Sequence, residues 1–208
     1  EAALAFFKKA AQTDADFCFP NRLEEVIALQ CAIQVNAADA RAPYYLGNFW
    51  YNARQYNEAI SCWELSRSLD SNFPTVRRNL ALAYYNKTNE PVKALAELEA
   101  AFNLDTSDAR VLMELDQLYK KLNRPHPERL ALLEEHPDCV EYRDDLYLER
   151  ATLYNQLGDY EKALNLLMSR NFHPWEGGEG KVTGQYLYAR IELAKKAFSE
   201  QKFNEAIA

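Results

Sequence analysis

An internal repeat of about 34 residues constrains this chain more than any other feature of its sequence. Three positions recur at a spacing of 34 residues: Leu46 and Leu80, Gly47 and Ala81, Trp50 and Tyr84. Four more recur at a spacing of 35: Ala59 and Ala94, Trp63 and Leu98, Ser66 and Ala101, Asp70 and Asp105. A repeat of this length cannot bury its apolar face alone, so neighbouring copies must stack.

The spacing of apolar residues within each copy predicts helices. Apolar positions fall at intervals of three and four residues, as on a helix face that packs against a neighbour. Small residues such as Gly47, Ala81 and Ala94 should let two helices approach closely. Turn signals lie where helix pairs should break, at 70–74, 89–91 and 158–159. No strand is needed, and the prediction is an all-α protein.

The recurring order of large, Leu, small, Tyr, Ala, large, Ala resembles the tetratricopeptide repeat family, best at residues 41–107 and 143–170. The resemblance implies a right-handed superhelix of antiparallel helix pairs, an α-solenoid, that serves as a protein-interaction or intramolecular docking scaffold. We expect one repeat domain over 1–208, with these parts: partial repeats in 1–40, repeats at 41–73, 74–107, 108–142 and 143–171, a glycine-rich loop at 172–184 and a partial repeat at 185–208.

Some positions depart from that pattern. Arg150 stands where Leu is usual, and Arg129 replaces a small alanine. Residues 15–40 lack the pattern of a regular first helix. We therefore predict irregular structure at 15–40 and 108–137. Both chain ends interrupt a repeat, from which we expect a fragment of a longer protein.

Composition and charge narrow the function. The formal net charge is −7, and no cluster of five or more Lys and Arg occurs, which argues against nucleic acid and anionic membranes as partners. No apolar run is long enough to span a bilayer, so we predict a soluble protein, with the cytoplasm favoured. The cysteines have neither metal-ligand nor disulfide-framework spacing, so we predict no metal and no cofactor. Three of the four fall in helical stretches, where we expect small buried side chains.

In tetratricopeptide repeats the first helix of each pair lines the concave face. Mapping that face gives eight candidate ligand-binding residues: Tyr44, Asn48, Tyr51, Asn52, Arg78, Asn79, Tyr85 and Asn86. Amides both donate and accept hydrogen bonds, and tyrosine adds an apolar ring, so this inventory suits a neutral polar ligand such as extended peptide or carbohydrate. The alternative is that these residues are simply solvated.

Certain members of the family hold the C-terminal carboxylate of a chaperone peptide with two Asn and three basic residues. Asn48, Asn79 and Arg110 occupy matching positions, but Tyr44 and Glu114 replace two of the bases. A carboxylate facing the ligand's carboxylate would repel it. The sequence therefore argues against binding of such tails.

Four of the six glycines lie at 177, 178, 180 and 184, next to residue types favoured at binding sites. The candidates there are His173, Trp175, Glu176, Glu179 and Lys181. Paired carboxylates beside an aromatic ring also occur in glycosidases, which makes Glu176 and Glu179 weak catalytic candidates. The alternative is a glycine-rich turn whose Trp packs on the preceding helix pair and whose Glu residues cap a helix from about Lys181 to Glu200.

Two phrases, residues 42–48 and 173–181, look like the repeat region of large bacterial proteins. Those proteins carry a domain of unknown function similar to the β-sandwich class of sugar mutarotases and glycoside hydrolases. The resemblance implies that the repeats support a carbohydrate-active domain of the same polypeptide, with the 173–181 loop reaching its sugar pocket. The histidines accompany no Ser or Cys nucleophile motif, so this fragment by itself is predicted to be non-catalytic.

Overall fold

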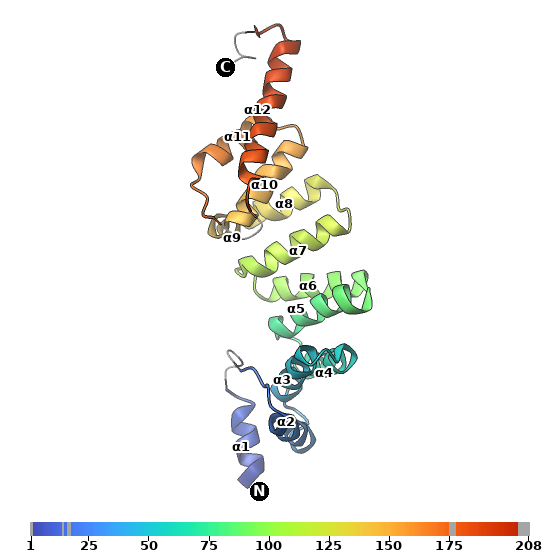
Figure 1. Ribbon diagram of the computed structural model, residues 1–208. Helices are drawn as coiled ribbons and strands as arrows, with labels where there is room; N and C mark the ends of the chain where they lie inside the picture. The colour runs from blue at the N-terminus through green and yellow to red at the C-terminus, as the bar shows by residue number, and fades with distance from the viewer. Residues whose placement is uncertain (1, 14, 16–17, 175–177, 204–208) are drawn as a thin grey trace. The chain divides into compact units, whose positions relative to one another are not determined.

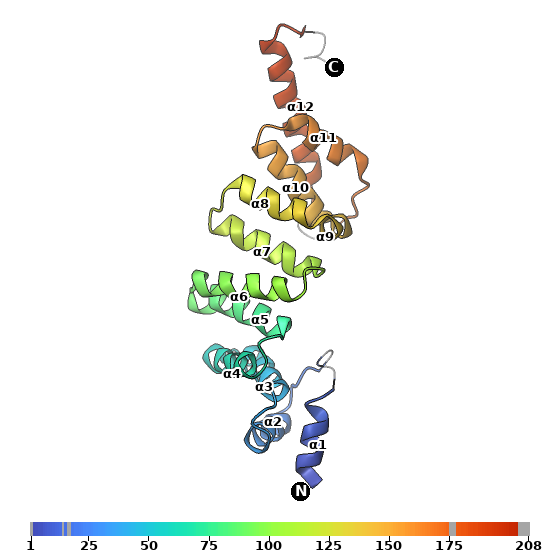
Figure 2. The same cartoon turned by 180° about the vertical axis from the view of Figure 1, so that it is seen from behind.

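The protein is described here from a computed structural model, which places residues 2–13, 15, 18–174 and 178–203. All regular structure in this part of the chain is helical (Figure 1, Figure 2). The chain divides into an N-terminal unit, residues 1–105, and a C-terminal unit, residues 106–208. Each unit has its own internal packing.

The N-terminal unit contains two closely packed helix pairs. Its elements are α1 (Ala2–Ala10), α2 (Leu23–Val35), α3 (Arg41–Asn52), α4 (Tyr56–Leu69), α5 (Pro74–Ala83), the π-helical turn η1 (Tyr84–Thr88) and α6 (Pro91–Leu104). Helix α3 packs on α4, and α5 packs on α6 (Figure 1). Helix α2 adds to the first pair by burying Val26 against Leu46 and Phe49.

The C-terminal unit contains α7 (Ala109–Lys121), α8 (His126–Glu135), α9 (Pro137–Tyr142), α10 (Asp144–Gln156), α11 (Tyr160–Ser169) and α12 (Lys181–Ser199). Helix α9 is a short addition between α8 and α10. Helix α12 packs on α10 and α11 with its first half, and its second half extends past both in the two views (Figure 1, Figure 2).

Small residues set the distance between paired helices, as the sequence predicted. A Cβ atom on Gly47 would lie 2.5 Å from Trp63 Cδ1 and 3.1 Å from the carbonyl oxygen of Ala59. Ala94 and Ala163 in the second helices are completely buried. Close packing at these points excludes a larger side chain.

The turns after α3, α7, α10 and α12 share one backbone geometry. Residues 54, 123, 158 and 201 in these turns adopt positive φ. In each case the next residue's N–H bonds to the carbonyl five residues before it, for example Gln55 to Trp50 at 2.8 Å and Asp159 to Tyr154 at 3.0 Å. This pairing satisfies helix-end carbonyls that would otherwise lack partners. The 158–159 turn signal lies at one of these turns.

The π-helical turn η1 explains why the repeat spacing changes from 34 to 35. Asn89 is the positive-φ residue of this pair and corresponds to Arg54, one residue later than a 34-residue period would place it. The N–H of Glu90 bonds to the carbonyl of Tyr84, six residues back, at 2.8 Å. A single extra residue is therefore absorbed as a π-turn, a feature often found near functional sites.

The prediction of irregular structure at 15–40 and 108–137 was wrong for most of both segments. Helix α2 occupies 13 residues of the first, and α7 and α8 occupy most of the second. Arg129 does not interrupt α8 because it forms two hydrogen bonds with Asp116, at 3.0 Å and 2.8 Å. Its guanidinium also bonds to Glu149 at 2.6 Å. A buried ion pair replaces two small residues.

Other expectations need correction. Cys139 is buried, but Cys31 is exposed although it lies in α2, and Cys62 is only partly buried. The long helix begins at Lys181 as predicted, yet no side-chain cap bond is found at its start, where Gly180 has a φ of 72°. Among the described helices, none is long and apolar enough to cross a bilayer.

Candidate functional site

A pocket of about 240 Å³ lies on the N-terminal unit. Side chains from three helices line it: Asn48, Tyr51 and Asn52 of α3, Trp63 of α4, and Asn79 and Leu82 of α5. We call this site the amide pocket. The helix periodicity places Asn48 and Asn52 one turn apart on the same face of α3, so both reach the pocket.

Hydrogen bonding fixes how the amides are oriented. The indole Nε1–H of Trp63 donates to Asn48 Oδ1 at 3.1 Å and to the Tyr44 carbonyl at 3.2 Å. Because an indole can only donate, the Asn48 atom that it meets must be the oxygen. The same oxygen accepts from Asn79 Nδ2 at 3.3 Å.

This orientation leaves one donor and one acceptor on two residues that line the pocket. The NH2 group of Asn48 and the carbonyl oxygen of Asn79 make no hydrogen bond within the described part of the chain. A ligand with one acceptor and one donor, such as a peptide unit, can satisfy both groups. The pocket is thus suited to hydrogen-bond recognition of a neutral polar group.

Aromatic rings form one side of the pocket. The Tyr51 ring lies 5.3 Å from Trp63 and 5.2 Å from Tyr56, measured between centroids. The Lys87 ammonium lies 4.3 Å from the Tyr56 centroid and 5.8 Å from that of Tyr51. Lys87 belongs to η1, so the π-turn supplies the cation that holds these rings.

The structure brings together four of the eight predicted groove residues: Asn48, Tyr51, Asn52 and Asn79. Tyr44 is buried, and its ring packs against Tyr45 and Phe73. Arg78 and Tyr85 are partly buried and Asn86 is exposed, and none of the three lines the pocket.

Trp63 and Leu82 were missed by the sequence analysis. The predicted face consists of polar residues and tyrosines of first helices, whereas Trp63 belongs to a second helix and Leu82 is apolar. The sequence feature that could have indicated Trp63 is the glycine at position 47, because a residue without a side chain leaves space for the large indole ring.

The glycine-rich segment is anchored at its beginning. His173 donates its backbone N–H to Asp144 Oδ2 at 2.7 Å, and its Nδ1 lies 3.1 Å from the same oxygen. Burial raises the pKa of Asp144, but these bonds and one from Arg170 together hold it below the usual value. Glu179 and Lys181 are exposed, whereas Trp175 and Glu176 lie outside the described residues.

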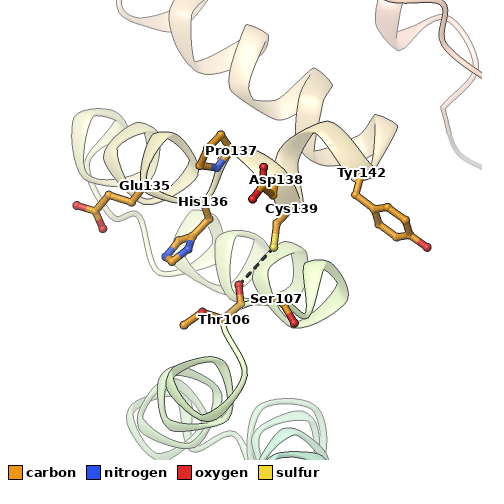
Figure 3. Close-up of a pocket in the computed structure, with 8 residues that line it drawn as sticks. All are labelled: Thr106, Ser107, Glu135, His136, Pro137, Asp138, Cys139 and Tyr142. Atoms are coloured by element: carbon orange, nitrogen blue, oxygen red, sulfur yellow. Dashed lines mark hydrogen bonds between the residues drawn. The ribbon is translucent and has the colours of Figure 1, made fainter.

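A second hollow, of about 380 Å³, lies on the C-terminal unit (Figure 3). It is lined by Thr106, Ser107, Glu135, His136, Pro137, Asp138, Cys139 and Tyr142. The Cys139 thiol donates to the Thr106 carbonyl at 3.4 Å, and Glu135 and Tyr142 lie at opposite ends of the hollow (Figure 3). This hydrogen bond links α9 to the segment that precedes α7 and has a structural role.

The thiol of Cys62, the sequence neighbour of Trp63, is also unsuited to nucleophilic chemistry. Burial, together with the charge of Glu58, raises the pKa of Cys62 to about 11, so the thiol stays protonated at neutral pH. The groups that line the pocket itself are amides, aromatic rings and one leucine. This arrangement can bind a ligand by shape and hydrogen bonding.

Comparison with solved structures identifies the architecture. No protein-family model matches the sequence. The structure of YrrB, a tetratricopeptide repeat protein with an unusual peptide-binding site, is similar over 87% of this chain and 88% of that one, with a TM-score of 0.61 and 17% identity. MamA from Desulfovibrio magneticus RS-1 is similar over 81% of this chain and 93% of that one, with a TM-score of 0.57 and 14% identity. The chain therefore has the tetratricopeptide-repeat fold.

Proposed function

We propose that this protein is a non-catalytic interaction scaffold whose amide pocket binds an extended peptide segment of a partner. The observation that carries the proposal is that the NH2 group of Asn48 and the carbonyl oxygen of Asn79, two residues that line the pocket, have no hydrogen-bond partner among the described residues. The fold shared with YrrB, a protein with a peptide-binding site, supports a peptide as the ligand. The partner is another protein or another domain of the same polypeptide.

The pocket favours a neutral segment over a charged one. The pocket is lined by amides, two aromatic rings and Leu82, and the Lys87 ammonium is already placed over the Tyr51 and Tyr56 rings. A peptide backbone offers a carbonyl to Asn48 and an N–H to Asn79, while an apolar side chain can contact Leu82 and Tyr51.

A random peptide library displayed on phage and selected on the full chain would supply the probes. For an enriched peptide, fluorescence anisotropy should show Asn79→Ala weakening binding about tenfold, roughly the loss of one hydrogen bond in a desolvated site. Asn48→Asp keeps both accepted hydrogen bonds but removes the donor, so it should weaken binding similarly.

The matched control is Asn86→Ala, because Asn86 is an exposed amide on η1 that does not line the pocket. Equal affinity of the Asn79 and Asn86 variants would contradict the proposal, as would a library that yields no binder. Binding of neutral oligosaccharides at the same residues would redirect the proposal to carbohydrate.

A second proposal is that the repeats support a carbohydrate-active domain of the mutarotase and glycoside-hydrolase β-sandwich class, with the 173–181 loop contributing to its sugar pocket. Its support is the composition of that loop and the exposure of Glu179 just before α12. Changing Glu176 or Glu179 to Gln in the full-length protein should then lower turnover of its sugar substrate. Unchanged turnover in both variants would remove this proposal.

A further inference from the structure

Two guanidinium groups of the C-terminal unit converge on one tyrosine. The Arg150 guanidinium carbon lies 4.7 Å from the centroid of the Tyr147 ring, and that of Arg170 lies 4.5 Å from it. The carboxylate of Glu141 joins them, with one oxygen 2.8 Å from Arg150 NH2 and the other 3.3 Å from Arg170 NH1. We call Arg150 and Arg170 the arginine fork.

Among the three side chains of this cluster, that of Glu141 is the most exposed. The side chains of Arg150 and Arg170 are 9% and 18% exposed, whereas that of Glu141 is 56% exposed. Glu141 lies near the end of the short helix α9. A solvent-exposed carboxylate thus covers two nearly buried cations, and a carboxylate from another molecule can reach the same place.

Arg150 is not fully used by its present partners. Its Nε is buried and makes no hydrogen bond within the described residues. The nearest other carboxylate is that of Glu134, 4.0 Å from Nε, and this oxygen accepts from the Tyr154 hydroxyl at 2.8 Å. Because arginine binds carboxylates best through two parallel N–H bonds, Arg150 retains capacity for a second bond.

Packing alone does not require an arginine at this position. The equivalent position of the other repeats holds a leucine, Leu46 in α3, Leu80 in α5 and Leu115 in α7, and all three are buried. Arginine here carries a desolvation cost that a leucine avoids. The presence of arginine where the other repeats have leucine therefore suggests that the positive charge of Arg150 has a function.

Arg170 is held from behind, so the fork persists when the Glu141 side chain leaves. Its Nε donates to Asp144 Oδ1 at 2.6 Å, and both terminal nitrogens donate to the backbone carbonyl of Glu141 at 3.0 Å. These bonds fix the guanidinium without the Glu141 carboxylate.

We propose that the arginine fork binds an acidic side chain of a partner peptide, and that Glu141 fills the fork in the free protein. The incoming carboxylate displaces that of Glu141, bonds to Nε and NH2 of Arg150, and meets NH1 of Arg170. This site is separate from the amide pocket and does not depend on it. Glu134, Asp144 and the net charge of −7 oppose anions, so the two guanidinium groups must outweigh this repulsion at close range.

The test compares two variants with the same net charge in the full chain. Glu141→Gln removes the carboxylate from the fork, and Glu161→Gln removes an exposed carboxylate on α11. The probe is a fluorescein-labelled hexapeptide of alternating Asp and Glu with blocked ends. Glu141→Gln should bind it about tenfold more tightly than the unchanged protein, because the internal competitor is gone, whereas Glu161→Gln should change little.

Further probes test whether binding requires acidic side chains and whether the peptide binds at the arginine fork. A hexapeptide of alternating Asn and Gln should not bind, and acetate alone should compete only weakly. In nuclear magnetic resonance spectra of Glu141→Gln, the Nε–Hε signals of Arg150 and Arg170 should shift on titration with the acidic peptide. Arg150→Leu, which restores the leucine of the other repeats, should abolish binding while circular dichroism shows retained helix.

Three results would overturn the proposal: equal affinity of the two Gln variants, full binding by Arg150→Leu, or no binding by any variant. If Arg150→Leu loses its helical signal, the titration of the Glu141→Gln variant decides, since unshifted Arg150 and Arg170 signals exclude the fork as the site. Preference for a free C-terminal carboxylate over the blocked peptide would assign the fork to chain ends instead.

Discussion

At the interface of α5 and α6 the small residues are Ala81 and Ala94, and at the equivalent positions of α7 and α8 stand Asp116 and Arg129. All four are almost completely buried, with at most 2% exposure. Two methyl groups thus correspond to a bidentate ion pair in the same fold. The difference shows that a buried repeat position can change from alanine to a charged residue when the facing position changes as well. The free-energy cost comes from burying a charge that has no partner.

The largest effect should come from breaking that ion pair on one side. Arg129→Ala leaves the Asp116 carboxylate buried without its bidentate partner, and we expect a loss of about 3–5 kcal/mol in unfolding free energy. Urea denaturation followed by hydrogen exchange of α7 and α8 amides would measure it. The double change Asp116→Ala with Arg129→Ala recreates the alanine pair and should cost clearly less than Arg129→Ala alone. A single variant that costs under about 1 kcal/mol would contradict the comparison.

Overfilling a small position should cost less than unpairing a buried charge. Gly47→Ala forces a methyl group to within 2.5 Å of the Trp63 ring, and we expect a loss of about 1–3 kcal/mol. The control is Gly184→Ala on α12, where no described atom outside its own helix backbone and its chain neighbours lies within 4 Å of the new methyl group. That variant should be neutral or more stable by up to about 1 kcal/mol. Thermal unfolding of both would decide, and equal midpoints would contradict close packing at Gly47.

Lowering the pH should act locally, at the carboxylate of Asp144, whose hydrogen-bond partners Arg170 and His173 follow α11 in the sequence. The folded-state pKa of Asp144 is lowered below its ordinary value of 3.8, so its stabilising contribution is present above that pH. It is lost as pH falls through the folded-state value. Hydrogen exchange should then show loss of protection at the His173 amide while α3 and α4 remain protected. Unchanged protection of His173 down to pH 2 would argue against this anchor.

The smallest effect should come from an exposed ion pair on α7. Arg110 is 65% exposed and lies 3.3 Å from Glu114. Arg110→Ala should change the unfolding free energy by no more than about 0.5 kcal/mol, since solvent screens such pairs. Measured beside Arg129→Ala, it separates the effect of burial from that of charge. A loss as large as that of Arg129→Ala would show that burial is not what distinguishes the two arginines.

The sequence predicted much of the architecture because packing repeats. Gly47, Ala94 and Ala163 marked close helix contacts, and 89–91 and 158–159 marked turns, since both depend on local size and backbone preference. Half of the predicted groove residues line the amide pocket, because the spacing of residues along a helix determines which of them share a face. The other half did not, because burial of Tyr44 and the shape of η1 depend on neighbouring helices.

What the sequence determined by itself is the helical repeat, its pairing and its candidate polar face, because each follows from periodicity and residue size. Only the tertiary structure decided how charges are matched. Asp116 meets Arg129 across two helices, and Glu141 meets Arg150 and Arg170 across three segments, so no local pattern could assign these partners. In the sequence alone, Arg129 and Arg150 look like departures from the repeat pattern. Their structural role depends on which carboxylate each one contacts in the folded protein.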